Sequence, residues 1–360
     1  MNLQPFLDDL ESRIDPAEEE ALEQAWISFC DLRWDKPFFA PSRRPRPAGI
    51  EWPRAFINDA IDDPELMVYS QLRMCSDMLA DGTGELLCVR SNFGTGIIPS
   101  MFGAEIFIMP YEHDILPGTR PLPRGRDDVA DIVAKGEMDF TRGLAGKAFE
   151  VAERYGEITA KHPNIRRFVN YYNPDLQGPL SLCEAMWGSE LYLDFYDDEE
   201  TVAAALDFLT ETYIAFTKRW KAMRPDFDDG HAVEWGMLHR GGTIVRNDAA
   251  MNISGDLYAE LVMPRDQRIL SEFGGGVHFC GRGEHYIHHL AGLENLSVIN
   301  MSQPECNDME TIYQNTVDKD IIIIGLRSDE VRRAVESGRD LRGRVHSGAS
   351  MAAWLDKEDR

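Results

Sequence analysis

A histidine and a cysteine two positions apart have the spacing in this chain that points most directly to chemistry. His278 and Cys280 lie in a glycine-rich stretch, FGGGVHFCGRG at 273–283. If 276–280 form a β-strand, both side chains project from one face, because side chains alternate along a strand. An imidazole nitrogen and a thiolate sulfur side by side are good Zn²⁺ ligands, and a catalytic zinc takes about three protein ligands. The alternative is a buried pair whose polar atoms are satisfied by neighbours.

A third metal ligand must come from elsewhere in the chain. Cys306 is the first candidate, because it follows the strand-like run LSVIN at 296–300. Glu305 beside it and Asp248, which follows TIVRN at 243–247, are expected to be catalytic and could also supply an oxygen ligand. Each residue has an alternative role: Cys306 capping a buried loop, Glu305 holding a backbone amide or Arg282, and Asp248 capping a helix.

Other polar residues also follow predicted strands. In a barrel, such positions form the wall of the pocket. We therefore expect a small-molecule substrate to be bound by Asn92, Tyr172, Asn173, Arg246 and Asn300, with Tyr171, Asp175, Glu234, His239 and Asn247 close by.

The elements that must position these residues alternate between short apolar runs and helical patterns. Eight strand-like runs stand at 85–89, 104–109, 165–172, 232–237, 243–247, 276–280, 296–300 and 320–325, and an amphipathic helix is expected at about 199–223. Alternation of this kind predicts a parallel sheet covered by helices. Eight strands favour an α/β fold of the (β/α)₈ TIM-barrel type over an open doubly wound sheet. No GxGxxG segment suggests a dinucleotide site.

The chain divides into three predicted parts. Residues 1–55 form an N-terminal helical segment and an arm rich in proline and arginine, 56–350 form the barrel as a single domain, and 351–360 are a C-terminal tail. The arm holds the run RRPRP at 43–47, which is expected to pair with the protein's own acidic surface.

The segment HFCG resembles part of the uroporphyrinogen-decarboxylase superfamily, on the side of its corrinoid-dependent methyltransferases. The resemblance extends to SNFGTGIIPSMFG at 91–103, 178–180, Trp187-Gly188, DDEETV at 197–202, 247–264 and NMSQPE at 300–305. It implies a TIM barrel in which a His-x-Cys pair and a distant cysteine bind zinc, which activates a thiol to receive a methyl group. The methyl donor would be a methyl-corrinoid carried by a partner protein, since this chain has no DxHxxG segment.

Two departures from that pattern matter. The decarboxylase grips porphyrinogen carboxylates with an arginine-rich N-terminal segment, and this chain has RRPRP instead, so decarboxylation of uroporphyrinogen is not expected. The methyltransferases place their last zinc cysteine near the C-terminus, where this chain reads HSGAS at 346–350. Two alternatives therefore stay open. One is a metal-independent decarboxylase or lyase with Asp248 as acid or base and Arg246 holding a substrate carboxylate. The other is a non-catalytic barrel that lost its zinc site.

The overall charge excludes some partners. The 360 residues carry 37 Lys and Arg against 62 Asp and Glu, a net charge of −25. Nucleic acids and anionic membranes bind basic surfaces, so neither is an expected partner. The six scattered cysteines, the absence of a secretory signal and the lack of a long apolar run predict a cytoplasmic protein. A homodimer is left open.

Overall fold

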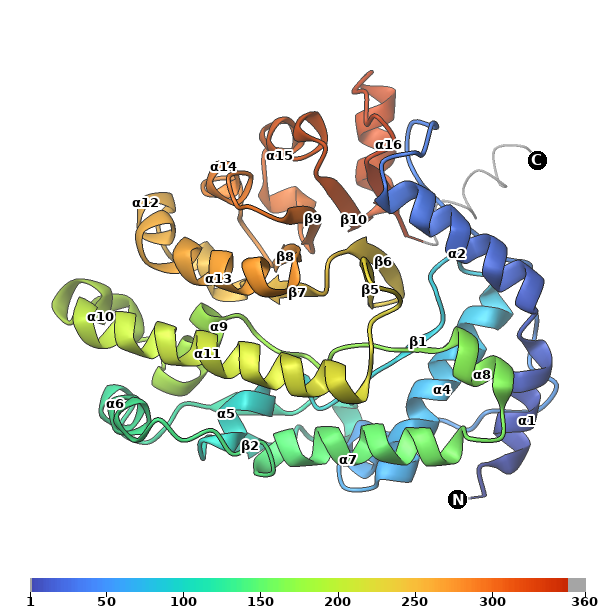
Figure 1. The fold of residues 1–360 in the computed structure, drawn as a ribbon, viewed down its shortest axis with the longest axis horizontal. Helices are drawn as coiled ribbons and strands as arrows, with labels where there is room; N and C mark the ends of the chain where they lie inside the picture. The colour runs from blue at the N-terminus through green and yellow to red at the C-terminus, as the bar shows by residue number, and fades with distance from the viewer. Residues whose placement is uncertain (1, 349–360) are drawn as a thin grey trace.

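Five parallel strands form the main sheet of the computed structural model, which describes residues 2–348. Their order is β11-β10-β9-β8-β7. The strands are β7 (Thr243–Arg246), β8 (Gly275–Phe279), β9 (Leu296–Met301), β10 (Ile322–Leu326) and β11 (Val345–Ser347). Helices α13 (Met263–Phe273), α14 (Ile287–Leu290), α15 (Met309–Asn315) and α16 (Ser328–Glu336) connect them. Nearly every residue of these strands is buried, as in a parallel sheet covered on both faces. Figure 1 shows the helices outside the strands.

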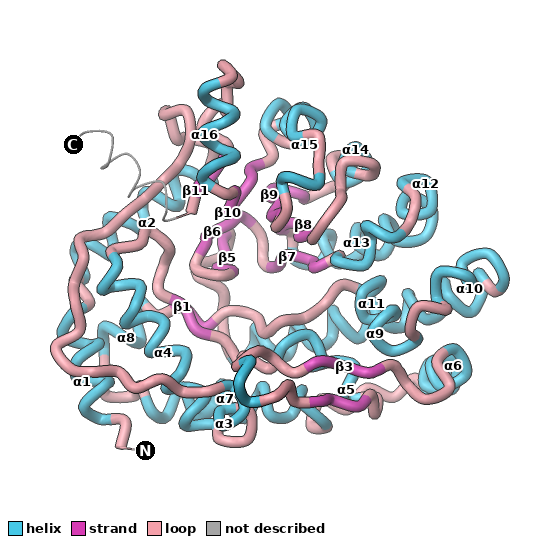
Figure 2. Tube along the Cα trace, turned by 180° about the vertical axis from the view of Figure 1, so that it is seen from behind, coloured by secondary structure: helices cyan, strands magenta, loops and turns pink. Residues whose placement is uncertain are grey.

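A second parallel pair lies in the other half of the molecule. Strands β1 (Cys88–Val89) and β4 (Asn170–Tyr171) pair with each other, and the segment after β4 reaches β7 through a parallel bridge between Gln177 and Arg246. The helices of this part include α3 (Ile57–Ala60), α4 (Pro64–Asp81), α5 (Ile97–Met101), α6 (Arg126–Lys135), α7 (Gly143–Ile158), α8 (Pro163–Phe168), α9 (Pro179–Trp187), α10 (Leu191–Asp197) and α11 (Glu199–Met223), whereas α12 (Gly255–Leu257) lies between β7 and α13. Figure 2 shows them as an outer layer. The fold is thus a mixed α/β fold with a five-stranded parallel sheet, and the strand pairing in residues 2–348 does not trace a closed eight-stranded barrel.

Helix α11 confirms the predicted amphipathic helix at 199–223. The side chain of Asp198 accepts a hydrogen bond from the Thr201 amide at its start. Its predicted buried stripe is at most 1% exposed at Val202, Leu206, Leu209, Tyr213, Phe216 and Trp220. The 3- and 4-residue spacing of these apolar residues was sufficient to find both the helix and its buried face.

Three predicted strands differ in the structure. The first half of 165–172 belongs to helix α8, which begins at Pro163, where the fixed backbone angle of proline favours a helix start. The run 104–109 gives β2 (Glu105–Phe107), which pairs with β3 (Gly118–Arg120) in an antiparallel hairpin outside the main sheet. Strand β11 was not predicted at all.

The run 232–237 is not one strand but a tight hairpin. Strands β5 (His231–Glu234) and β6 (Met237–Arg240) pair antiparallel around Trp235 and Gly236. Both turn residues have positive φ, at 52° and 79°, as two-residue hairpin turns favour. The run reads as one strand in the sequence, although its Trp-Gly pair contains the signal for a turn.

Arginines of the RRPRP run form ion pairs with acidic residues of the protein itself, as expected from the sequence. Helices α1 (Gln4–Arg13) and α2 (Pro16–Cys30) precede this run. Arg43 pairs with Glu19 at 2.8 Å in the interior, and Arg46 pairs with Asp15 at 2.6 Å and Glu18 at 3.0 Å. Among the described residues, no helix is long and apolar enough to span a bilayer. The predicted tail 351–360 lies outside the described residues.

Candidate metal centre

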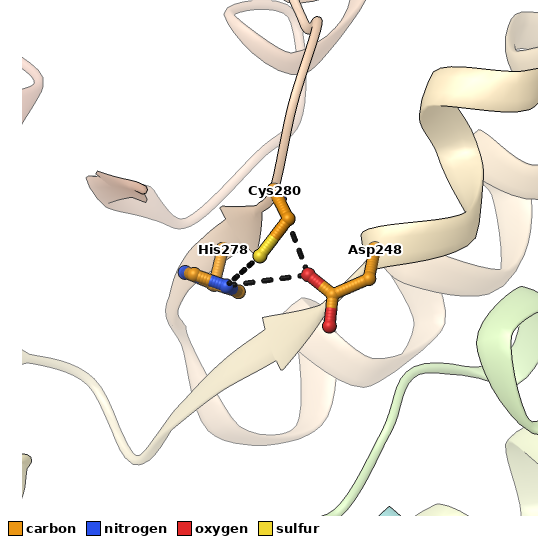
Figure 3. Close-up of side chains that lie close together, drawn as sticks. All are labelled: Asp248, His278 and Cys280. Carbon is orange, nitrogen blue, oxygen red and sulfur yellow. Dashed lines mark hydrogen bonds and ion pairs between the residues drawn. The ribbon is translucent and has the colours of Figure 1, made fainter. Parts of the chain in front are cut away.

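Asp248, His278 and Cys280 converge at the carboxyl edge of the main sheet. The Nε2 atom of His278 lies 3.3 Å from Asp248 Oδ1 and 3.4 Å from Cys280 Sγ. The Cys280 amide donates to the same Asp248 oxygen at 3.1 Å. Figure 3 shows the three side chains pointing toward one another. One nitrogen, one sulfur and one oxygen atom, all within 4.8 Å of one another, form a group that could hold a metal ion.

The strand register explains why these residues meet. Arg246 at the end of β7 is paired with His278, and His278 is paired with Asn300 on β9. The strands are parallel, so the residues just beyond β7 and β8 leave the sheet at the same edge, and Asp248 and Cys280 follow those two ends. Sites of α/β folds form at this edge, where the loops after the strands converge.

Asn300 determines which nitrogen of His278 faces the group. The Asn300 side-chain amide donates to the Ile324 carbonyl at 2.7 Å, which leaves its oxygen facing His278 Nδ1 at 2.5 Å. Nδ1 must therefore carry a proton and donate it. The lone pair of the neutral imidazole then lies on Nε2, the atom that faces Asp248 and Cys280. Metal-binding histidines are commonly oriented in this way by an acceptor behind the ring.

The loop after β9 supports the cysteine and the residues that follow it. Ser302 Oγ lies 3.5 Å from Cys280 Sγ, and the Gln303 side chain accepts from the Gly281 amide at 2.6 Å. Asn307 accepts from the Gly283 amide at 2.7 Å. The position of Cys280 is therefore fixed by contacts on both sides of its strand end.

The charges of the group stabilise one another. Burial favours the neutral form of the Asp248 carboxyl, but the hydrogen bonds from His278 and Cys280 outweigh it and lower the pKa of Asp248. Burial likewise disfavours a charged His278, yet the contacts with Asp248 and Cys280 raise the pKa of the imidazole to about 9. Both pKa shifts favour an ion pair between an Asp248 carboxylate and a His278 imidazolium.

The other two residues proposed from the sequence do not join this group. Cys306 is exposed, in a turn after β9, and Asp248 takes the third position instead. The Glu305 carboxylate is half exposed and forms an ion pair with Arg327 at 2.8 Å. A loop of several residues separates both from β9, so following a strand was too coarse a criterion for placing them.

Four of the predicted substrate-binding residues lie in a polar network beside the group. Arg246 is buried and donates to Glu234 at 2.7 Å and to the carbonyls of Pro174 and Leu176. Asn173 donates to Glu234 at 3.2 Å. Asn92 accepts a hydrogen bond from Arg90 at 2.8 Å, and the Arg90 guanidinium lies over the Tyr172 ring. Asp175 forms ion pairs with Arg90 at 3.3 Å and with Arg246 at 3.4 Å. The donors of Arg246 are thus largely taken by the protein itself.

Trp235 is a neighbour of the group that sequence reasoning did not single out. The centroids of the Trp235 and His278 rings are 5.4 Å apart. The Arg246 guanidinium lies 4.8 Å from the centroid of the Trp235 ring. A bulky residue with φ of 52° is unusual, and such backbone strain tends to occur at functional sites. The hairpin turn therefore presents an aromatic ring to the histidine.

A solved structure with a similar fold is a methyltransferase from Methanosarcina mazei. It is 15% identical to this chain with a TM-score of 0.59, and the match covers 91% of this chain and 92% of the other. No family model matches the chain, and no curated protein matches it by sequence. The chain shares the fold of a methyltransferase.

Proposed function

We propose that this chain is a methyltransferase-like enzyme that transfers a methyl group to or from a thiol at a zinc ion held by Asp248, His278 and Cys280. The observation that carries the proposal is the convergence of these three donors at the carboxyl edge of a sheet whose fold a methyltransferase shares. We further propose that residues 56–350 are a divergent (β/α)₈ barrel of the uroporphyrinogen-decarboxylase superfamily, preceded by the arm at 1–55.

The donor set fits zinc. Zn²⁺ accepts imidazole nitrogen, thiolate sulfur and carboxylate oxygen, and three protein ligands leave a fourth position for a substrate. Two of the donors already have supporting partners, Asn300 behind His278 and Ser302 beside Cys280. A bound Zn²⁺ would lower the pKa of an acceptor thiol and so supply a thiolate near neutral pH. In this chain, Asp248 takes the place of the missing C-terminal cysteine.

The methyl group would come from a separate methyl-corrinoid protein. The transfer would form a sulfur–carbon bond while the cobalt–carbon bond of the donor breaks, with its electron pair left on the donor and the thiol proton released to water. Asp248, His278 and Cys280 would hold the metal ion that binds the acceptor sulfur. A small-molecule thiol and a corrinoid protein are thus the proposed partners.

An acid–base reaction without metal is the second candidate, because Asp248 and His278 already form a close ion pair. Such a pair could move a proton in a lyase or decarboxylase. The proposed role of Arg246 in holding a substrate carboxylate gains no support, because its donors contact Glu234 and backbone carbonyls. Metal dependence separates the two candidates.

Free methylcobalamin and a small thiol provide the test of the proposed function. We expect the zinc-loaded protein to accelerate demethylation of methylcobalamin, followed by its absorbance change. His278→Ala should lower this rate at least about 100-fold, because removing only a hydrogen-bond partner of a metal ligand already costs about 10–100-fold. Cys306→Ser is the matched control and should keep the rate. Full activity in metal-free protein, or in His278→Ala, would contradict the proposal.

A further inference from the structure

The cations at the carboxyl edge of the parallel strands are all engaged by carboxylates. In the described part of the chain, the arginines and lysines within three positions of these strand ends are Arg90, Arg246, Arg282 and Arg327. Arg90 and Arg246 share Asp175, and Arg246 also pairs with Glu234 at 2.7 Å. This inner cluster therefore balances two cations against two carboxylates.

The two outer arginines are paired as well. Arg282, two residues after Cys280, lies 3.0 Å from Glu284. Arg327, just after β10, lies 2.8 Å from Glu305 and 2.5 Å from Asp329. Neither offers an uncompensated positive charge to a ligand. A bound Zn²⁺ would be offset by the Asp248 carboxylate and a Cys280 thiolate, so the metal group adds no excess of positive charge to this neighbourhood.

The polar neighbours of the group, Asn300, Ser302 and Gln303, carry no charge, and other neighbours are aromatic or apolar. Trp235 lies against the His278 ring on one side. Met251 is 42% exposed and lies against Gly281, the residue after Cys280, where an added Cβ would be 2.7 Å from the Met251 sulfur. A thioether and an indole can contact an alkyl group, and an indole also attracts a cation through its ring face. Neither can neutralise an anion.

From these contacts we propose that the acceptor thiol carries no negative charge, and that the site prefers a thiol with a cationic or alkyl end to one with a sulfonate or carboxylate. The proposal rests on the proposed function, because it concerns the molecule that reaches the metal group. Burying an anion without a countercharge is costly. The chain's net charge of −25 acts in the same direction, since it repels anions and attracts cations at long range.

Three thiols of nearly equal shape test the charge preference. They share the form HS–CH₂CH₂–X, where X is trimethylammonium, tert-butyl or sulfonate. Their binding is measured on Co²⁺-loaded protein through the thiolate-to-cobalt charge-transfer band, which needs no turnover. The account predicts that the first two bind at least tenfold more tightly than the sulfonate at low ionic strength. It also predicts that added salt narrows the difference between the two charged thiols.

A variant that adds one positive charge next to the metal group tests the same charge preference from the protein side. Met251→Lys should tighten sulfonate binding at least tenfold and weaken trimethylammonium binding, whereas the matched control Met251→Gln should leave the order unchanged. Equal binding of all three thiols to the unmodified protein would overturn the charge inference and leave the metal–thiol function standing. No charge-transfer band with any thiol would overturn the proposed function and this inference with it.

Discussion

Asn300 acts on the metal group through His278, and its contribution can be measured directly. Asn300→Leu keeps a similar volume but removes the acceptor that holds the Nδ1 proton. We expect metal affinity to fall about 10–100-fold, the usual effect of removing such a partner. The measurement is competition with a chromophoric chelator, with circular dichroism to confirm folding. Unchanged affinity in a folded variant would show that Asn300 does not orient the ring.

At the scale of single residues, the sequence predicted two of the three residues of this group well. His278 and Cys280 could be found because a strand places positions two apart on one face. Asp248 was one of three candidates for the third position, since the sequence could not tell how far each loop travels after its strand. Trp235 was invisible as a neighbour, because only the hairpin turn brings it to the imidazole.

At the scale of elements, the β5–β6 turn should be sensitive to substitution at Gly236. Its φ is 79°, and a Cβ there would lie 2.9 Å from both Glu85 Cβ and the Leu86 carbonyl. Gly236→Ala should lower the free energy of unfolding by about 3 kcal/mol, combining strain in φ with overpacking. The matched control is Gly136→Ala, whose φ is 64° and whose Cβ would meet nothing within 4 Å. It should cost about 1 kcal/mol. Equal losses in urea unfolding would rule out the proposed backbone clash.

Helix α13 carries a second element-scale prediction. Asp266 is fully buried, and burial raises the pKa of its carboxyl from the usual 3.8 to about 7, although Tyr258 and Asn247 donate to it. The folded state thus keeps a proton that the unfolded state releases near pH 4, so this group's contribution to stability is lost as the pH rises toward 7.

Asp266→Asn cannot titrate and should escape this loss. Relative to the unmodified protein, its free energy of unfolding should rise by about 2–3 kcal/mol between pH 5 and pH 8, at about 1.4 kcal/mol per pH unit. Urea unfolding at both pH values measures the difference. Parallel pH dependence in the two proteins would mean that Asp266 is already ionised in the fold at pH 5.

The sequence predicted the positions of strands more easily than it predicted which strands pair with each other. The runs at 243–247, 276–280, 296–300 and 320–325 became adjacent strands of one sheet, because continuous apolar runs suit strands buried on both faces. The run 104–109 has a similar pattern but pairs in a separate hairpin. Periodicity records which face is buried, and it carries no information about which segment lies alongside.

At the scale of the whole molecule, acidity should exclude nucleic acid. The arm holds the densest run of arginines, and Arg43 and Arg46 are already paired with acidic residues of the N-terminal helices. We therefore expect no measurable binding of duplex DNA at physiological salt, tested by a fluorescence anisotropy titration. Sub-micromolar binding that weakens steeply with salt would instead identify the arm as a functional surface.

Metal content of the purified protein tests the central claim most directly. The account predicts about one zinc per chain in protein made under zinc-replete conditions. The metal should be lost in Cys280→Ser and in Asp248→Ala and retained in Cys306→Ser, because only the first two remove an atom of the group. Elemental analysis after removal of loosely bound ions gives the ratio. Metal-free protein, or zinc that persists in Cys280→Ser and disappears in Cys306→Ser, would contradict the account.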